Sequence, residues 1–352
     1  MKKPNVKLCG INTGHIQGIA IDKKREYIYY SFTTCLIKTD LYGNIIGSVK
    51  GLAGHLGCIA YNYDDGRVYG SLEFKHDKIG AGILKSLGNR IDVKDGFYVA
   101  IFDVEKIDRR DMDAEKDGIM TAVFLDEVLR DYEACGHRYG CSGIDGMTFA
   151  PMAGDLSSKK HLYVAYGVYS DTARCDNDHQ VLLRYDVDEL KKYERPLVQT
   201  DMHRCGPSKC DGKYFVYTGN TNFGVQNLEY DEKTGLIFAA VYPGQKNNFP
   251  NYPMFAIDMK KSSEYGSLCG IDEKGEKLFL AEIGKYDEKS GVFGIDFPYG
   301  TTGMASLSDG SFLFSRDFRD ENGWGTDIAL YEFDEEKGFV ESKNDKRDKT
   351  PY

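Results

Sequence analysis

Short runs of alternating apolar and polar residues recur along the chain and form a repeating unit. Each unit opens on a glycine-containing stretch followed by an alternating run, as in GHIQGIAID (14–22), GHLGCIAYN (54–62), SGIDGMTFA (142–150), FGVQNLEYD (223–231) and YGTTGMASL (299–307). A turn rich in Asp, Gly or Lys follows, then a second β-rich run, then a third run that ends in Asp at position 40, 103, 186, 258 or 334. Period-two alternation bounded by such turns predicts strands.

Five such units, each with a weaker fourth strand, predict an all-β fold, a five-bladed β-propeller. The alternative is a six- or seven-bladed ring with degenerate blades in 104–140 or 262–298. We expect one domain over residues 1–340, closed by an N-terminal strand at 6–11 that joins the last blade. A charged C-terminal tail is predicted at 341–352, and a short helix near 126–132.

The insertions between the second and third strands are predicted to carry the function. They are expected at 72–96, 167–180, 242–253 and 316–327, and in a propeller they lie on the same face as the loops that enter the inner strands. Long loops in compact domains are usually functional. We therefore place the site on this face.

Polar residues stand near the start of the predicted inner strands, where small residues are expected. We expect these side chains to meet in one polar funnel: His15, Gln17, His55, Asp145, Gln226 and Glu229. The alternative is that they only hydrogen-bond adjacent inner strands. The insertions add Glu73, His76, His179, Asn247 and the single tryptophan, Trp324. Carboxylates, amides and aromatic rings around a polar opening suit a polyhydroxylated small-molecule or glycan ligand.

The leading functional hypothesis is a hydrolase or lyase that acts on a carbohydrate or glycoside. His15 or His55 would be the base, and Glu73, Asp145 or Glu229 the acid, with pKa values raised by burial and mutual repulsion. The residues expected to bind substrate are Gln17, His76, His179, Gln226, Asn247 and Trp324. His15 and His55 could instead hold one divalent cation. The alternatives are a non-catalytic propeller that binds a ligand or protein, and a calcium-dependent phosphohydrolase.

Composition and motifs narrow the range of functions. The chain has 352 residues, 41% hydrophobic and 28% charged, which is typical of a globular protein. A net charge of −10 argues against binding to nucleic acid or to an anionic membrane. The sequence contains no G-x-S-x-G, P-loop, G-x-G-x-x-G or H-E-x-x-H motif of the corresponding enzyme classes. Nine cysteines, an odd number, and the lack of a signal-like or membrane-spanning stretch favour a cytoplasmic location.

The stretch HIQGIAIDKKREYIYYSFTTCLIKTDLYGNIIGSV (15–49), followed by GHLGCIA (54–60), resembles bacterial propeller proteins of unassigned function. The similarity continues through YGCSGIDGMTFAP (139–151), YTGNTNFGVQNLEYD (217–231) and TGMASLSDG (302–310). The resemblance implies the propeller fold and brings no substrate with it. It singles out six motif positions: His15, Gln17, Ser31, Thr33, Lys38 and His55.

Overall fold

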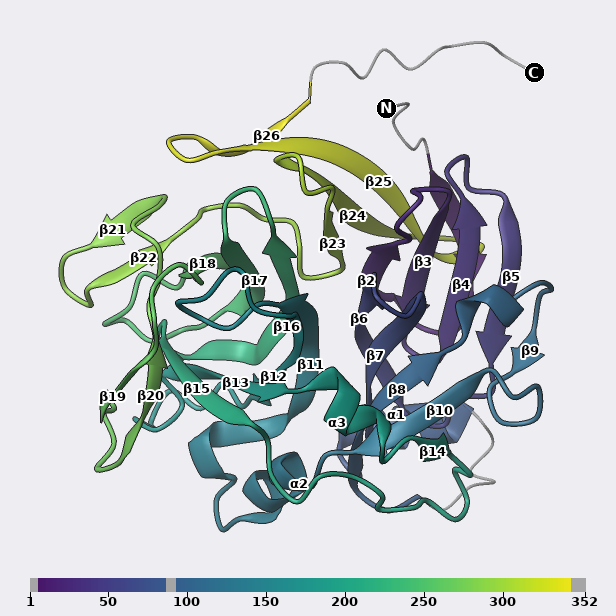
Figure 1. Cartoon of the computed structure of the whole chain (residues 1–352), viewed down its shortest axis with the longest axis horizontal. Coiled ribbons are helices and arrows are strands. Elements are labelled where there is room, and N and C mark those ends of the chain that lie inside the picture. The colour runs from purple at the N-terminus through teal and green to yellow at the C-terminus, as the bar shows by residue number, and fades with distance from the viewer. Residues whose placement is uncertain (1–5, 87–92, 343–352) are drawn as a thin grey trace.

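The computed structural model describes residues 6–86 and 93–342, which form a five-bladed β-propeller (Figure 1). Its five inner strands surround one axis, and each packs against the next until the ring closes. They are β2 (Ile16–Ile21), β6 (His55–Asn62), β11 (Cys141–Ala150), β16 (Thr221–Asp231) and β23 (Met304–Ser306). The predicted all-β, five-bladed fold is confirmed, and a six- or seven-bladed ring is wrong.

The first two blades have four antiparallel strands each and a short extra strand at the outer edge. Blade 1 contains β2, β3 (Tyr27–Phe32), β4 (Cys35–Asp40) and β5 (Ile45–Lys50), with β9 (Met112–Asp113) added in parallel. Blade 2 contains β6, β7 (Arg67–Phe74), β8 (Gly96–Phe102) and β10 (Met120–Phe124), with β14 (Arg195–Pro196) at its edge. Segments from later in the chain therefore cover the outer edges of the early blades.

Blades 3 and 4 share the segment 262–298 as their outer covering. Blade 3 contains β11, β12 (His161–Val168), β13 (His179–Tyr185), β15 (Gly212–Tyr217), β20 (Lys274–Leu278) and β19 (Glu264–Ser267). Blade 4 contains β16, β17 (Leu236–Pro243) and β18 (Met254–Asp258). Isolated bridges from β18 to Leu280 and Ile295 replace its fourth strand, beside the hairpin of β21 (Lys285–Asp287) and β22 (Val292–Gly294). Residues 262–298 thus form no blade of their own.

Helices lie only in the connections of the described chain. They are α1 (Lys78–Ser86), α2 (Asp126–Glu133), α3 (Val187–Lys191) and the 3-10 turns η1 (Val104–Lys106) and η2 (Arg138–Gly140). The helix predicted near 126–132 is confirmed as α2. Residues 104–140 form no blade of their own, because β10 is the fourth strand of blade 2 and β9 joins the edge of blade 1. Among the described residues, no helix combines the length and apolar composition needed to cross a bilayer.

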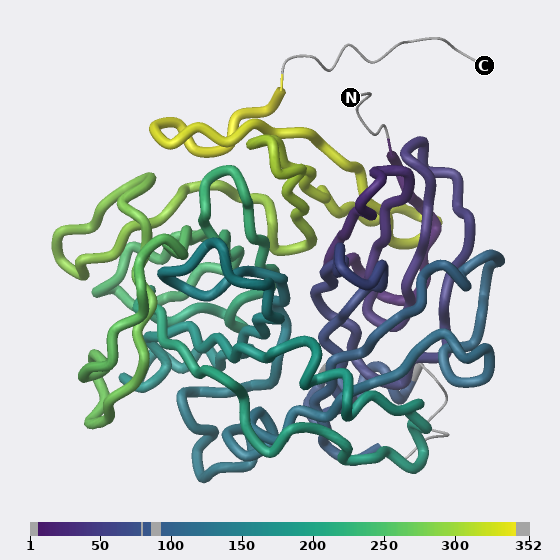
Figure 2. The backbone as a smooth tube through the Cα atoms, viewed as in Figure 1, coloured from purple at the N-terminus to yellow at the C-terminus, as the bar shows by residue number. Residues whose placement is uncertain are grey.

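The last blade is built from both ends of the described chain. It contains β23, β24 (Ser311–Asp320) and β25 (Gly323–Asp334). Two strands then share the edge of β25: β1 (Lys7–Ile11) pairs along residues 324–327, and β26 (Gly338–Glu341) pairs along residues 331–334. Figure 2 follows the chain from the purple first blade to the yellow last one. Glu341, expected to begin a tail, ends β26, and 343–352 lie outside the described residues.

The insertion predicted at 316–327 is wrong. β24 and β25 continue through it as a hairpin, and only Glu321 and Asn322 lie between them. The other three predicted insertions are connections, and α1 lies in the first.

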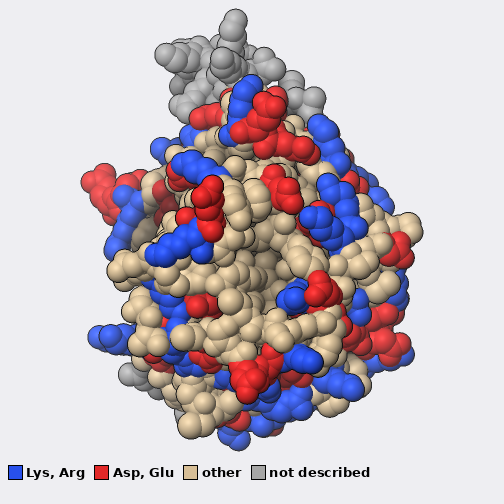
Figure 3. Space-filling view, turned by 90° about the vertical axis from the view of Figure 1, so that its left-hand side faces the viewer, with Lys and Arg blue, Asp and Glu red and all other residues tan. Residues whose placement is uncertain are grey.

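Close contact between inner strands depends on small residues. A Cβ atom on Gly18 of β2 would lie 2.9 Å from the backbone nitrogen of Ile59 on β6, which is too close for an ordinary side chain. Large buried aromatic residues such as Tyr30, Tyr69 and Phe238 fill the space further out in the blades. Charges of both signs are interspersed on the side that carries β19 and β21 (Figure 3). The apolar core therefore lies in the blades around the ring, whereas the inner strands also carry buried polar side chains such as Asp145 and Thr148.

Candidate functional site

A cavity of about 280 Å³ lies where the inner strands begin, on the face predicted to hold the site. We call it the loop-face cavity. Six candidate residues meet in it: His15, Gln17, His55, Glu73, Asp145 and Gln226. Its lining is completed by Lys75, Ser142, Ile144, Gly167, Phe223 and Tyr242. Residues far apart in sequence are thus brought to one opening, as the propeller fold predicts.

Two glycines make room for the carboxyl groups. A Cβ atom on Gly57 would lie 2.1 Å from Asp145 Oδ1, and one on Gly143 would lie 2.1 Å from Glu73 Oε2. Gly143 also has a φ of 129°, a conformation that other residues rarely adopt. The register of the inner strands is irregular at this end, for example between Leu56 and Ile59. Such bulges redirect side chains.

Glu73 and Lys75 form a buried ion pair at the cavity wall. Their side chains are 6% and 7% exposed, and Glu73 Oε1 lies 2.6 Å from Lys75 Nζ. The lysine also donates to the Ser142 carbonyl at 2.9 Å and lies 3.4 Å from Asp77. Burial alone would lower the pKa of Lys75, but Glu73 and Asp77 outweigh it and raise that pKa. The pair therefore brings almost no net charge to the cavity.

Asp145 is the second buried carboxyl group. Its Oδ1 accepts a hydrogen bond from the Cys58 backbone N–H at 3.2 Å. Burial, and then the neighbouring Glu73, raise the pKa of Asp145 well above its usual value. This environment favours the protonated carboxyl.

Both histidines are held in their neutral form. Burial, Lys75 and His15 lower the pKa of His55 to about 3. Its Nδ1 is buried with no hydrogen-bond partner among the described residues, and it lies 3.7 Å from Glu73 Oε1. Burial also lowers the pKa of His15, and Asp317 partly opposes this. The His15 ring lies 5.5 Å from the ring of Trp324.

The side chains of Gln17, Gln226 and Phe223 line the same cavity as the carboxyl groups and the histidines. Gln17 Nε2 lies 3.2 Å from His15 Nε2 and donates to Thr33 Oγ1 at 3.3 Å. Gln226 donates to the Phe223 carbonyl at 3.2 Å. Phe223 is 49% exposed with a φ of 68°, so an apolar ring is held at the rim on an unfavourable backbone.

The sequence pattern assigned no role to Lys75, Phe223 or Tyr242, which help to line the cavity. Lys75 directly follows the end of β7 and lies two residues beyond Glu73, which was already a candidate. No sequence signal identified Phe223, whose position depends on a positive φ.

Several predicted residues lie outside the loop-face cavity. His76 is exposed, and its Nδ1 lies 2.9 Å from Asp95. His179 is buried against Tyr217 in blade 3. Asn247 is exposed in the β17–β18 connection, and Trp324 reaches the site only through His15. These four do not converge with the other candidates.

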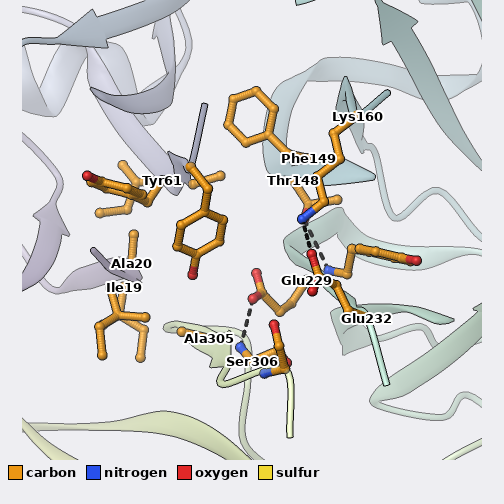
Figure 4. A pocket seen from close by; sticks show the side chains of 16 residues that line it. Ile19, Ala20, Tyr61, Thr148, Phe149, Lys160, Glu229, Glu232, Ala305 and Ser306 are labelled. Carbon is orange, nitrogen blue, oxygen red and sulfur yellow. Dashed lines mark hydrogen bonds and ion pairs between the residues drawn. The ribbon is translucent and has the colours of Figure 1, made fainter. Parts of the chain in front are cut away.

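Glu229 lies toward the opposite end of the channel. It lines a different cavity, where its carboxylate accepts from the Ser306 backbone N–H at 2.7 Å (Figure 4). Lys160 and Glu232 form an ion pair beside it. The prediction that Glu229 shares a funnel with Asp145 is therefore wrong.

The divalent-cation hypothesis gains no support from the side chains. No group of three or more His, Cys, Asp or Glu side chains in the described part of the chain is arranged to hold a metal ion. The cation that acts on His55 is the Lys75 ammonium, which lowers the pKa of this histidine.

Comparison with known proteins gives similarity only among solved structures. No family model and no curated protein matches this sequence. A functionally unknown protein from Desulfotomaculum acetoxidans DSM 771 aligns over 95% of this chain and 71% of its own, at 9% identity and a TM-score of 0.38. Hydrazine synthase from Kuenenia stuttgartiensis aligns over 92% of this chain, at 10% identity and a TM-score of 0.33. This chain spans 64% of that protein's length.

Proposed function

We propose that the protein is an enzyme that cleaves a C–O bond of a small, uncharged sugar or glycoside in the loop-face cavity, by hydrolysis or elimination. One observation supports this most directly. Asp145, a buried carboxyl whose pKa is raised, shares the cavity with two histidines whose pKa values are lowered. An acid that keeps its proton beside a base without one is the arrangement that acid–base catalysis needs near neutral pH.

Asp145 would donate its proton to the leaving oxygen as the C–O bond breaks. His15 would take a proton from the attacking water in hydrolysis. In elimination it would take the proton from a carbon that lies next to the cleaved bond and is made acidic by a neighbouring carbonyl group. His15 suits this role better than His55, because it is less buried. The Cys58 N–H and the Lys75 ammonium both favour the carboxylate that Asp145 becomes.

The cavity lining favours an uncharged ligand with hydroxyl groups. The volume of about 280 Å³ is near the lower end of the ~300–1,000 Å³ of small-molecule sites. Buried polar atoms are normally hydrogen-bonded, so the unpartnered His55 Nδ1 is a position for a ligand group. Phe223 offers an apolar ring surface at the rim. We place the protein in the cytoplasm, where its nine free cysteines would stay reduced.

A non-catalytic binding protein is the second candidate. Gln17 and Asp145 already hydrogen-bond Thr33 and the Cys58 backbone, so part of the polar lining also serves the fold. A phosphohydrolase fits this cavity less well, because its lysine is paired with Glu73 and Asp77.

The proposal is tested by measuring the turnover and the binding of a panel of glycosides. Asp145→Asn and His15→Gln preserve side-chain shape and should each lower kcat by about 10²–10⁴-fold while sugar binding remains. His76→Gln is the matched control, because His76 is exposed and outside the cavity. Binding by the wild type without turnover would establish the non-catalytic alternative. Turnover that survives both substitutions would refute the assigned roles.

A further inference from the structure

The opposite end of the channel holds a second and larger cavity. Its volume is about 600 Å³, roughly twice that of the loop-face cavity. It is lined by the turns that join the first and second strands of the blades, and we call it the turn-face cavity. It shares Tyr63, Lys160 and Ser306 with the inner cavity that contains Glu229, so the two are contiguous.

Four basic side chains line the turn-face cavity from two blades. Lys23 and Arg25 come from the β2–β3 turn of blade 1, and Lys159 and Lys160 come from the β11–β12 connection of blade 3. The whole chain has a net charge of −10, so this gathering of cations differs from the overall composition. Basic groups on two sides of a cavity can hold one multiply charged anion between them.

The acidic residues of the lining are largely engaged. The Asp22 carboxylate accepts hydrogen bonds from three backbone N–H groups of its own turn, those of Lys24, Glu26 and Tyr27, at 2.6–3.1 Å. Glu232 is paired with Lys160. The third acid, Asp64, is exposed. Two of the three carboxylates therefore already have partners.

Two of the basic groups, Lys23 and Lys159, can still accept a ligand. Lys23 Nζ donates only to the Tyr63 carbonyl, at 3.4 Å, and no carboxylate of the described residues lies within ion-pair distance of it. Lys159 pairs with Asp186 and Asp188 at 2.7 and 3.1 Å, with its side chain 51% exposed. Exposed ion pairs of this kind are weak, so a bound dianion can compete with them. Arg25 is already partnered, because its guanidinium donates to the Leu307 carbonyl and lies 3.8 Å from Asp309.

The deeper wall does not add a fixed negative charge. Burial raises the pKa of Glu229 to about 8, while the Ser306 N–H, Asp231 and Lys160 make smaller contributions. Its carboxyl group is therefore largely protonated at neutral pH. Ser158, Ser306 and Ser308 are among the residues that line the turn-face cavity.

We propose that the turn-face cavity binds the phosphate group of a small metabolite, held between Lys23 and Arg25 on one side and Lys159 and Lys160 on the other. Lysine ammonium groups and the arginine guanidinium are the usual protein partners of phosphate. The cavity exceeds the size of a bare phosphate ion, so a phosphate ester would fill it better. This site is independent of the chemistry proposed for the loop-face cavity.

The experiment is calorimetric titration of the full chain with inorganic phosphate and with ribose 5-phosphate at two salt concentrations. The double variant Lys23→Ala/Lys159→Ala should weaken binding by about tenfold or more, and added salt should weaken wild-type binding. Lys24→Ala is the matched control, because Lys24 is exposed in the same turn but does not line the cavity. His15→Gln should leave phosphate binding unchanged.

Each outcome has a defined meaning. Tighter binding of ribose 5-phosphate than of phosphate identifies a phosphorylated metabolite, and equal binding identifies the free ion; both support the site. Absence of binding to both probes overturns the proposal. Equal losses in Lys24→Ala and in the double variant, once thermal melts show both to be folded, would overturn it as well.

Discussion

At the scale of single residues, the motif positions shared with bacterial propeller proteins fall into two groups. Ser31 donates to the Gly57 carbonyl at 2.6 Å, and Lys38 donates to the carbonyls of Val104 and Ile107, at 2.9 and 3.4 Å. These bonds join blade 1 to blade 2 and its connections. The two histidines and Gln17 of the motif line the loop-face cavity instead. A polar residue at a motif position of this protein therefore does not by itself indicate a role in binding or catalysis.

The fit between Gly57 and Asp145 gives a first prediction. In Gly57→Ala the new Cβ would overlap Asp145 Oδ1 and approach Ser71 Oγ, at 2.1 and 2.6 Å. Overpacking of this kind should cost about 1–3 kcal/mol in the free energy of unfolding and displace the Asp145 carboxyl. Urea denaturation measures the cost. Gly82→Ala is the control, because Gly82 lies in α1 with nothing within 4 Å of its new Cβ, and it should be neutral or slightly stabilising.

The raised pKa of Glu229 predicts a pH dependence of stability. The group has a pKa of about 8 in the folded protein against 4.5 normally. Between these values the folded state binds more protons than the unfolded state, so the free energy of unfolding falls as pH rises from about 4.5 to 8. At about 1.36 kcal/mol per pH unit the loss is at most about 5 kcal/mol.

Glu229→Gln should remove that part of the pH dependence. Urea denaturation of the wild type and the variant at several pH values between 5 and 9 measures the difference, which cancels other titrating groups such as Asp145. Parallel curves for the two proteins would show that Glu229 ionises normally.

At the scale of strands and loops, the repeat predicts the blades because period-two alternation survives wherever a strand has one buried face. The prediction fails at 316–320. These residues of β24 are half-buried or exposed, so Arg316, Asp317 and Arg319 follow no apolar alternation and resemble a loop. Glu229 was misplaced for a geometric reason. It stands three residues beyond Gln226 on β16, which at ~3.3 Å per residue moves it about 10 Å along the channel.

The pairing of β1 with β25 predicts that β1 stabilises the last blade. Leu8 is 2% exposed, whereas its neighbour Cys9 is exposed. Leu8→Ala should therefore lower the free energy of unfolding by about 2–5 kcal/mol, because it leaves a cavity under the strand that closes the ring. Cys9→Ala should change it by less than about 0.5 kcal/mol. Thermal and urea denaturation of the two variants provide the comparison; equal effects would mean that β1 adds little to the last blade.

At the scale of the whole molecule, the ring places two cavities at opposite ends of one channel, and the same inner strands reach both. β16 contributes Gln226 to the loop-face cavity and Glu229 to the inner cavity that adjoins the turn-face cavity. The sequence repeat could predict that such a channel exists. It could not predict the larger cavity, because the short turns that form it contain ordinary charged residues whose convergence depends on the curvature of the closed ring.

Because β1 pairs with β25, β1 has no partner during synthesis until more than three hundred residues have followed it. The inner strand of blade 1 likewise lacks its neighbour β23 until residues 304–306 have been made. Unpaired strand edges favour aggregation and recognition by chaperones. A nascent chain that stalls before residue 323 would therefore be a natural substrate for cellular quality control, even though four of its five blades were already made.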